Sequence, residues 1–338
     1  MAAEGVNRAV ALESFDPENP TSTLKIIERP IPEPASGEVL VNPSDVSSIT
    51  GNYAGFKLPE DGVGIPGGDA LGTVAKLGAD VTGLEVGQRV VSLVWPTGEG
   101  RGTWQQYAVM PAAALIPVPD VLSDEVASQF RVNPLTAYAF VDTLEREGLL
   151  QTHWVVSSAA ASALGHMFAS YARNKGIRTI NLVRRDDAAE GLRAAGADVV
   201  INTETTADLA AAIREATGGA GADAHFECVG GDLSGVAGGL RDGGVIFAYG
   251  ALGERNVSVP IPDLLFRYVS VRGFWLSLYF KESSQEQRVE ALKNALQAMA
   301  EGKLVVPAGG KRFSLDQVKE AVAESVRPGR GGKVFLEG

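Results

Sequence analysis

From residue 153 to residue 275 the chain alternates short apolar runs with amphipathic segments, and this alternation constrains its fold more than any other feature. The apolar runs have strand character at 154–157, 178–183, 198–201, 224–229, 245–249 and 269–275. Helical periodicity occupies 163–175, 187–195, 207–217 and 233–240. Strands joined through helices run parallel and are covered on both faces. The pattern therefore predicts an α/β fold with a doubly wound parallel sheet.

The first third of the chain has a different character, because short β-type runs at 38–41, 72–77, 88–94 and 107–109 are separated by Gly and Pro. A long helix predicted over 286–302 leads back to a β-type run at 333–336, so we expect the C-terminus to close the first domain. A length of 338 residues also favours two domains. We place one domain at 1–122 with 278–338, and the other at 123–277.

Charge and composition disfavour several classes of partner. Thirty Lys and Arg against 41 Asp and Glu give a net charge of −11, which repels nucleic acid and anionic membranes. Any phosphate-bearing ligand therefore needs a local basic pocket. The single cysteine, Cys228, and the histidines His153, His166 and His225 lack metal-ligand spacing, so we expect no metal site.

The start of the chain, MAAEGVNRAV, has no apolar core of the kind that a signal peptide needs. No run approaches the roughly 18 apolar residues of a membrane span. One cysteine in 338 residues fits a reducing compartment. We expect an intracellular protein that is not secreted, in the cytoplasm or, after processing, in an organelle matrix such as that of mitochondria.

The turn after the run 154–157 is where a doubly wound sheet binds a phosphate, because the amides of the next helix N-terminus point there. The turn from Ala160 to Gly165 reads AASALG, so only the last glycine of a GxGxxG pattern is present. Ala and Ser are small enough for backbone amides to approach a phosphate, although Ala lacks the positive-φ freedom of Gly. An Ala-rich helix start without a ligand is the alternative interpretation.

The positive charges at the end of the second strand, 178–183, indicate which dinucleotide is bound. Arg184 follows Gly165 by about 20 positions, where an acidic residue would bind the ribose hydroxyls of NAD and an arginine favours the 2′-phosphate of NADP. The guanidinium groups of Arg184 and Arg185 suit a phosphate better than a diol, which favours NADPH as cofactor. The alternative is two solvated arginines that pair with Asp186 and Asp187.

Segments spread over nearly the whole chain carry a family resemblance. They are 42–45 (NPSD), 51–53 (GNY), 102–104 (GTW), 132–138 (VNPLTAY), 178–184 (RTINLVR), 228–231 (CVGG) and 272–277 (RGFWLS). The chain resembles the medium-chain dehydrogenase/reductase superfamily and, within it, the zinc-independent trans-2-enoyl thioester reductases of mitochondrial type. GNY and GFWLS separate these reductases from the alcohol dehydrogenases, whose zinc-ligand segment GHE is replaced here by Gly67-Gly68-Asp69.

The resemblance implies a GroES-like, β-rich substrate domain, a Rossmann domain that binds NADPH, and a homodimer formed through the last Rossmann strands. By position, Tyr53 matches the catalytic tyrosine of the family. The implied cofactor contacts are Asn133, Ala161, Ser162, Ala163, Leu164, Arg184, Tyr249, Gly250, Phe274, Trp275, Leu276 and Lys333. Two departures bear on phosphate affinity. The family usually has Asn-Ser-Gly-Val at 161–164 and Arg-Asp-Arg at 184–186, where this chain has ASAL and RRD.

The chemistry that the resemblance implies needs a hydride at Cβ of the double bond and a proton at Cα. NADPH supplies the hydride. A tyrosine, with a reference pKa of about 10, is protonated at neutral pH and can supply the proton. Tyr53 follows Gly51-Asn52 in a loop of small residues and suits this role; an ordinary loop aromatic is the alternative.

We therefore expect an oxidoreductase that reduces the double bond of trans-2-enoyl thioesters of CoA or acyl-carrier protein with NADPH. An NADPH quinone or alkenal reductase on the same scaffold is one alternative, because small changes in a pocket decide the acceptor. An NADPH-binding protein without turnover is another, given the glycine-poor turn.

Overall fold

The computed structural model describes residues 5–14, 16, 19, 21–45, 62–92, 102–327 and 332–338. The chain divides into two compact units. The first comprises Met1–Val132 and Ala308–Gly338, and the second comprises Asn133–Pro307. Each unit has its own sheet and its own apolar core.

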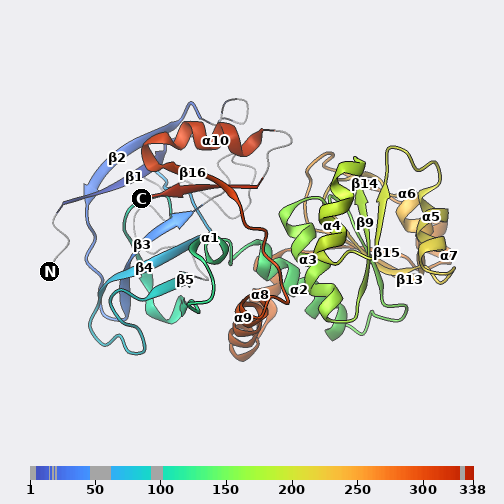
Figure 1. The fold of residues 1–338 in the computed structure, drawn as a ribbon, viewed down its shortest axis with the longest axis horizontal. Helices are drawn as coiled ribbons and strands as arrows, with labels where there is room; N and C mark the ends of the chain where they lie inside the picture. Colours follow the sequence, from blue (N-terminus) through green and yellow to red (C-terminus); the bar gives the residue numbers. More distant parts are fainter. Residues whose placement is uncertain are drawn as a thin grey trace. The chain divides into compact units, whose positions relative to one another are not determined.

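Six parallel strands form the sheet of the second unit, in the order β10-β9-β8-β11-β13-β15 (Figure 1). Their bounds are β8 Trp154–Ser157, β9 Arg178–Val183, β10 Val199–Asn202, β11 Ala222–Glu227, β13 Leu240–Ala248 and β15 Ser270–Gly273. A short parallel pair, β12 Gly231–Asp232 with β14 Val257–Ser258, lies outside this sheet. The order runs outward from β8 in one direction and from β11 in the other. The predicted doubly wound sheet is therefore confirmed.

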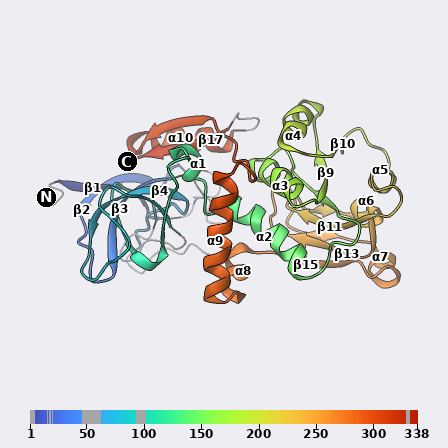
Figure 2. The same cartoon turned by 60° about the horizontal axis from the view of Figure 1, so that its bottom comes forward.

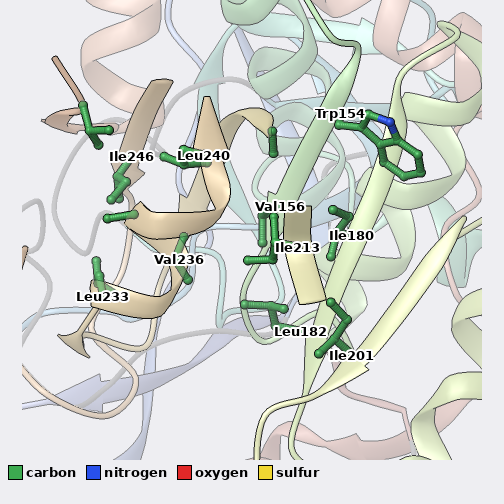
Figure 3. Packing of buried hydrophobic residues seen from close by; sticks show 13 residues of the cluster. Trp154, Val156, Ile180, Leu182, Ile201, Ile213, Leu233, Val236, Leu240 and Ile246 are labelled. Atoms are coloured by element: carbon green, nitrogen blue, oxygen red, sulfur yellow. The ribbon is translucent and has the colours of Figure 1, made fainter. Parts of the chain in front are cut away.

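Helices cover both faces of this sheet. Their bounds are α2 Asn133–Arg146, α3 Ala163–Asn174, η2 Asp186–Ala188, α4 Ala189–Ala195, α5 Leu209–Ala216, α6 Ser234–Gly239, α7 Ile261–Phe266, α8 Leu276–Glu282 and α9 Gln285–Ala300. Alternate strand residues point to opposite faces, and the apolar ones bury against different helices. On one face Ile213 of α5 packs with Val156 and Ile180 (Figure 3). On the other face Val183 packs with Ala169 of α3 and Leu192 of α4.

Aromatic rings anchor α2 and α3 to the centre of the sheet. The ring of Phe140 on α2 stacks on that of Phe226 on β11, with centroids 3.7 Å apart. Phe168 of α3 meets both rings edge to face. Because edge-to-face and stacked pairs add to the gain from burial, this cluster fixes the helices against β11.

The first unit is built on a mixed, largely antiparallel sheet in the order β16-β17-β3-β4-β5-β7, with β6 paired to β3. Strands β1 Val6–Leu12 and β2 Leu24–Pro30 form a separate antiparallel pair. The other bounds are β3 Glu38–Asp45, β4 Ala70–Leu77, β5 Arg89–Ser92, β6 Ala108–Pro111, η1 Ala112–Ala114, β7 Leu115–Pro117, α1 Asp124–Ala127, β16 Gly310–Ser314, η3 Leu315–Gln317, α10 Val318–Val326 and β17 Lys333–Glu337. Strand β17 pairs with β3, so the C-terminus closes the first unit, as the sequence predicts.

The two units differ from the expected domain ranges at both boundaries. Helix α1 contacts β4, and Asp124 pairs with Arg89 of β5, so residues 123–132 belong to the first unit. Helices α8 and α9 contact α2, and Figure 2 shows α9 as one long helix beside α2. They therefore belong to the second unit rather than the first. The assignment of α8 and α9 to the second unit follows from their packing against α2. The local sequence pattern gives no information about this packing.

A buried carboxylate holds the segment that leads into α2. Asp69, 8% exposed, accepts hydrogen bonds from the backbone N–H of Arg131 at 2.8 Å and of Val132 at 3.4 Å. Burial raises the pKa of Asp69 to about 6, although the amides and the charges of Lys333 and Arg131 oppose that rise. Asp69 thus carries a proton in the folded state at pH values where the unfolded chain does not.

We predict that Asp69 makes the stability of the first unit depend on pH. Its pKa is raised on folding, so its contribution is complete below about pH 4 and is lost as the pH rises through about 6. The variant Asp69→Asn mimics the neutral acid at every pH. Relative to this variant, the free energy of unfolding of the wild type should fall by about 3 kcal/mol between these two pH values. Urea unfolding of both proteins at about pH 4 and about pH 7.5 measures this difference.

The exposed Asp120→Asn change in the same unit controls for the loss of one carboxylate. A difference between wild type and Asp69→Asn that stays constant across the two pH values would contradict this assignment.

Candidate functional site

The carboxyl ends of the six parallel strands meet at one edge of the second unit. The strand order turns between β8 and β11, because β8 continues toward β9 and β10 while β11 continues toward β13 and β15. In open α/β sheets the ligand crevice lies outside the carboxyl ends at such a point. The loops that follow β8 and β11 are therefore the two walls of the candidate site.

The turn after β8 is held by its own hydrogen bonds, although it lacks the first two glycines of the GxGxxG pattern. Ala159 has a positive φ of 46°, and the amide of Ser162 bonds to the Ala159 carbonyl at 2.9 Å. The Ser162 hydroxyl caps α3 by accepting from the Gly165 amide at 3.2 Å. The positive φ thus falls at Ala159, one residue before the AASALG segment, and Ser162, at the position of the second glycine, has a φ of −73°.

The last glycine of the GxGxxG pattern, Gly165, lies at a position where no side chain fits. A Cβ atom at this position would lie 2.1 Å from the carbonyl oxygen of Ala160, a distance that no side chain can occupy. Helix α3 therefore approaches the turn closely, and its N-terminal amides lie directly behind the turn. Ala161 is exposed, while Ser162, Ala163 and Leu164 are half-buried. This arrangement fits a pyrophosphate of a dinucleotide.

The two arginines after β9 differ in their partners. Arg185 Nε lies 3.2 Å from Asp187 Oδ1, and both side chains are 69% exposed. Arg184 is exposed and makes no hydrogen bond or ion pair with the part of the chain that the structure describes. Asp186 accepts from the side chain of Asn202 at 2.9 Å. The pairing proposed as the alternative thus involves Arg185, and Arg184 remains available for an anion.

The loop after β11 contains groups that the sequence analysis did not select. The Cys228 amide donates to Ser158 Oγ at 2.9 Å, which joins the β11 loop to the turn after β8. Buried Glu227 ends β11 and lies beside buried His225, with 2.6 Å between Oε2 and Nε2. The sequence does contain a signal for this pair, because a Glu and a His lie within an otherwise apolar run. The pair was missed because the run was interpreted only as a buried apolar strand.

The segments that follow β13 and β15 carry further predicted contacts of this unit. Tyr249 and Gly250 follow β13, and a Cβ on Gly250 would lie 2.9 Å from the Cβ of Cys228, so the two loops pack closely. Burial raises the pKa of Tyr249. The ring of Phe274 packs edge to face on Phe140, with centroids 4.8 Å apart. Trp275, which precedes α8, is 47% exposed, so part of its large ring is accessible to solvent.

Three further predicted residues lie elsewhere. Asn133 is the first residue of α2, and Leu276 is the first residue of α8; both are half-buried. Lys333 begins β17 in the first unit, where its charge acts on Asp69. Tyr53, the predicted catalytic residue, lies outside the described residues. Among the residues that the structure does describe, no group of three or more His, Cys, Asp or Glu could hold a metal ion.

Among the helices of the described residues, none combines the length and the apolar character that a membrane span requires.

Comparison with known proteins gives a family match in each unit. Residues 37–120 match the family described as alcohol dehydrogenase GroES-like domain, and residues 163–301 match the family described as zinc-binding dehydrogenase. The chain is 33% identical to the mitochondrial enoyl-[acyl-carrier-protein] reductase of Homo sapiens over 88% of this chain and 78% of the relative.

Two solved structures share the fold over nearly their full length. A proposed NADPH:quinone reductase from Bacillus thuringiensis superposes with a TM-score of 0.86 at 28% identity and covers 99% of both chains. The quinone oxidoreductase of Escherichia coli, solved in complex with NADPH, superposes with a TM-score of 0.81 at 22% identity over 98% of this chain and 100% of that chain.

The chain belongs to the medium-chain dehydrogenase/reductase superfamily, in its zinc-independent branch with the mitochondrial enoyl reductases. It is an oxidoreductase with a GroES-like domain and a Rossmann-type domain. The fold class inferred from the sequence is therefore confirmed.

We predict that Arg184 selects NADPH over NADH. Arg184→Ala should raise the Kd for NADPH roughly tenfold to a hundredfold, because a charge-assisted contact to the 2′-phosphate is lost. The Kd for NADH should change by less than about threefold, since NADH lacks that phosphate. Fluorescence titration of both dinucleotides measures the effect.

Arg185→Ala is the matched control, because Arg185 already pairs with Asp187. Its loss of NADPH affinity should be smaller. Equal losses of NADPH and NADH affinity in Arg184→Ala would show that this guanidinium does not bind the 2′-phosphate.

Proposed function

We propose that this protein reduces the carbon–carbon double bond of trans-2-enoyl thioesters, carried by CoA or acyl-carrier protein, with NADPH as the hydride donor. The observation that carries the proposal is the close-packed N-terminus of α3 after β8, which lies at the same sheet edge as Arg184, a residue without a partner among the described residues. The 33% identity to a mitochondrial enoyl-[acyl-carrier-protein] reductase supports the choice of acceptor.

The chain's own residues would have three tasks in this reaction. The amides at the start of α3 hold the pyrophosphate, and Arg184 holds the 2′-phosphate. Trp275, Phe274 and Tyr249 limit the space at the ends of β13 and β15. NADPH supplies a hydride to Cβ when it is bound. The Tyr53 hydroxyl donates its proton to Cα as the enolate collapses, and solvent restores that proton.

Turnover with different acceptors tests this proposal. Purified protein should oxidise NADPH with crotonyl-CoA or a medium-chain trans-2-enoyl-CoA and should convert each to the saturated thioester. Tyr53→Phe should lower kcat by roughly 10²–10⁴, the range for loss of a general acid, with little change in the Kd for NADPH. Rapid mixing with absorbance at the reduced nicotinamide band measures the rate.

The control for Tyr53→Phe is Tyr107→Phe, a half-buried tyrosine of the first unit that is not assigned to the reaction. An unchanged kcat in Tyr53→Phe would remove Tyr53 from the mechanism. Absence of any thioester reduction by the wild type would reject the proposed acceptor.

Reduction of a quinone is the second candidate function. The observation that favours it is the fold shared with the proposed NADPH:quinone reductase from Bacillus thuringiensis at 28% identity. An ortho-quinone belongs in the same acceptor series. Strong quinone turnover without thioester turnover would favour this candidate, and tight NADPH binding with no acceptor reduced would favour a protein without catalysis.

We infer that the protein is a homodimer joined through β15. This strand is the last in the sheet order, and Val271 on it is 38% exposed. The neighbouring α7 exposes Ile261 at 72% and Phe266 at 74%. An open sheet edge beside exposed apolar side chains is a site for strand pairing, and a second copy of the same edge completes the sheet symmetrically.

Val271→Lys should therefore convert the dimer to a monomer, because the two copies would place like charges at the shared edge. Light scattering after gel filtration gives the mass. Val121→Lys is the matched control, since Val121 is 71% exposed in the first unit. A wild type that is already monomeric, or a Val271→Lys protein with the mass of the control, would contradict pairing through β15.

A further inference from the structure

A buried carboxylate ends β11 and plays no part in the reaction proposed above. Glu227 is 2% exposed and makes hydrogen bonds on both oxygens. Its Oε2 lies 2.6 Å from His225 Nε2, and its Oε1 accepts the amides of Val229 and of Gly230, the latter at 2.8 Å. One side chain thus satisfies two backbone amides of the loop that follows.

The surroundings of Glu227 keep it ionised. Burial raises the pKa of Glu227, but the hydrogen bond and charge of His225 and the two loop amides outweigh burial, so the pKa lies below its ordinary value. His225 Nδ1 has no hydrogen-bond partner among the described residues. The contact of Nε2 with Glu227 is thus the hydrogen bond that orients the His225 ring.

The amides held by Glu227 belong to a loop with little freedom. The Cys228 carbonyl accepts from Leu252 N at 2.7 Å, and the Val229 carbonyl accepts from Gly253 N at 3.0 Å and from Glu254 N at 2.8 Å. A Cβ on Gly230 would lie 2.1 Å from the carbonyl oxygen of Glu254, so the two segments are in direct contact. Glu227 thereby anchors the loops that follow both β11 and β13.

This anchored loop forms one wall of the candidate nucleotide crevice. The Cys228 amide donates to Ser158 Oγ, which lies at the end of β8 just before the phosphate turn. The amides of a surface loop can form hydrogen bonds with water, so they do not need a buried acceptor. Burying the Glu227 carboxylate costs desolvation free energy. We therefore infer that the role of this carboxylate is to fix the geometry of the loop.

We propose that Glu227, oriented by His225, is a positioning residue for the dinucleotide: it holds the β11 loop in the conformation that binds the cofactor. This inference rests on the proposed function, because it assumes that the cofactor lies between the β8 turn and the β11 loop. Glu227 acts through the backbone of 228–230 and touches no reacting atom.

The same strand offers a matched control at its opposite end. Asp223, fully buried at the start of β11, accepts the amides of Thr152 and His153 at 2.9 and 2.8 Å. It is paired with Arg241 at 2.6 Å. Both carboxylates bind two backbone amides and one basic side chain, but Asp223 lies at the amino edge of the sheet, away from the crevice.

The experiment compares Glu227→Gln with Asp223→Asn in the full chain. Thermal unfolding gives Tm, titration gives the Kd for NADPH, and steady-state rates with crotonyl-CoA give kcat and KM. Both variants should lower Tm to a similar extent. Glu227→Gln should raise the Kd and KM for NADPH by roughly five- to tenfold with kcat within about twofold, since charged acceptors bind amides about twice as strongly as neutral ones. Asp223→Asn should leave the Kd within about twofold.

Glu227→Ala removes the hydrogen bonds to the loop and should raise the Kd for NADPH more than Glu227→Gln does. A smaller loss of affinity in Glu227→Gln, whose side chain has the same shape as glutamate, supports a positioning role. Wild-type affinity in a folded Glu227→Gln and Glu227→Ala would overturn the inference while leaving the proposed function intact. An equal loss of affinity in Asp223→Asn would also overturn it, because general destabilisation would then explain the effect. A wild type that does not bind NADPH would overturn the proposed function and this inference together.

Discussion

The parallel pairing of β8 with β11 is the interaction on which the rest of the second unit depends. It brings the turn that starts α3 and the loop of residues 228–231 to the same sheet edge. Helices on both faces stabilise the pairing, and the stacked rings of Phe140 and Phe226 fasten α2 to β11. Without this register, Ser158 and Cys228 could not share a hydrogen bond, and the crevice would lose one of its walls.

If an acidic protein is to bind a phosphorylated ligand, nearby groups must attract the phosphate against the repulsion of the net charge. With a net charge of −11 the chain as a whole repels phosphate. In the proposed site, the backbone amides at the start of α3 and the Arg184 guanidinium, which has no partner in the described part of the chain, would provide the attraction, while Arg185 pairs with Asp187. Asp186 and Asp187 make their contacts with Asn202 and Arg185 rather than with the Arg184 guanidinium.

The sequence predicted those parts of the fold that local pattern determines. Strands β8 and β9 begin and end where the apolar runs do, and α3 follows the expected helix within one residue. Helix α8, which begins directly after the expected strand 269–275, was not predicted, and its contact with α2 is not visible in the local sequence. Glu227 was also not selected, since its partners are loop amides and a neighbouring histidine whose geometry appears only in three dimensions. Tyr53 remains a prediction from the resemblance alone.

The left-handed backbone of Ala159 has a consequence for how the crevice behaves before a ligand arrives. A residue with a Cβ in this region is strained by roughly 1–2 kcal/mol, whereas glycine would adopt it freely. The same methyl group removes conformations from the unfolded chain, so the loop is stiffer than a glycine-rich one. A stiff turn loses less entropy when a ligand docks, so a turn with few glycines can bind its ligand at a lower entropic cost.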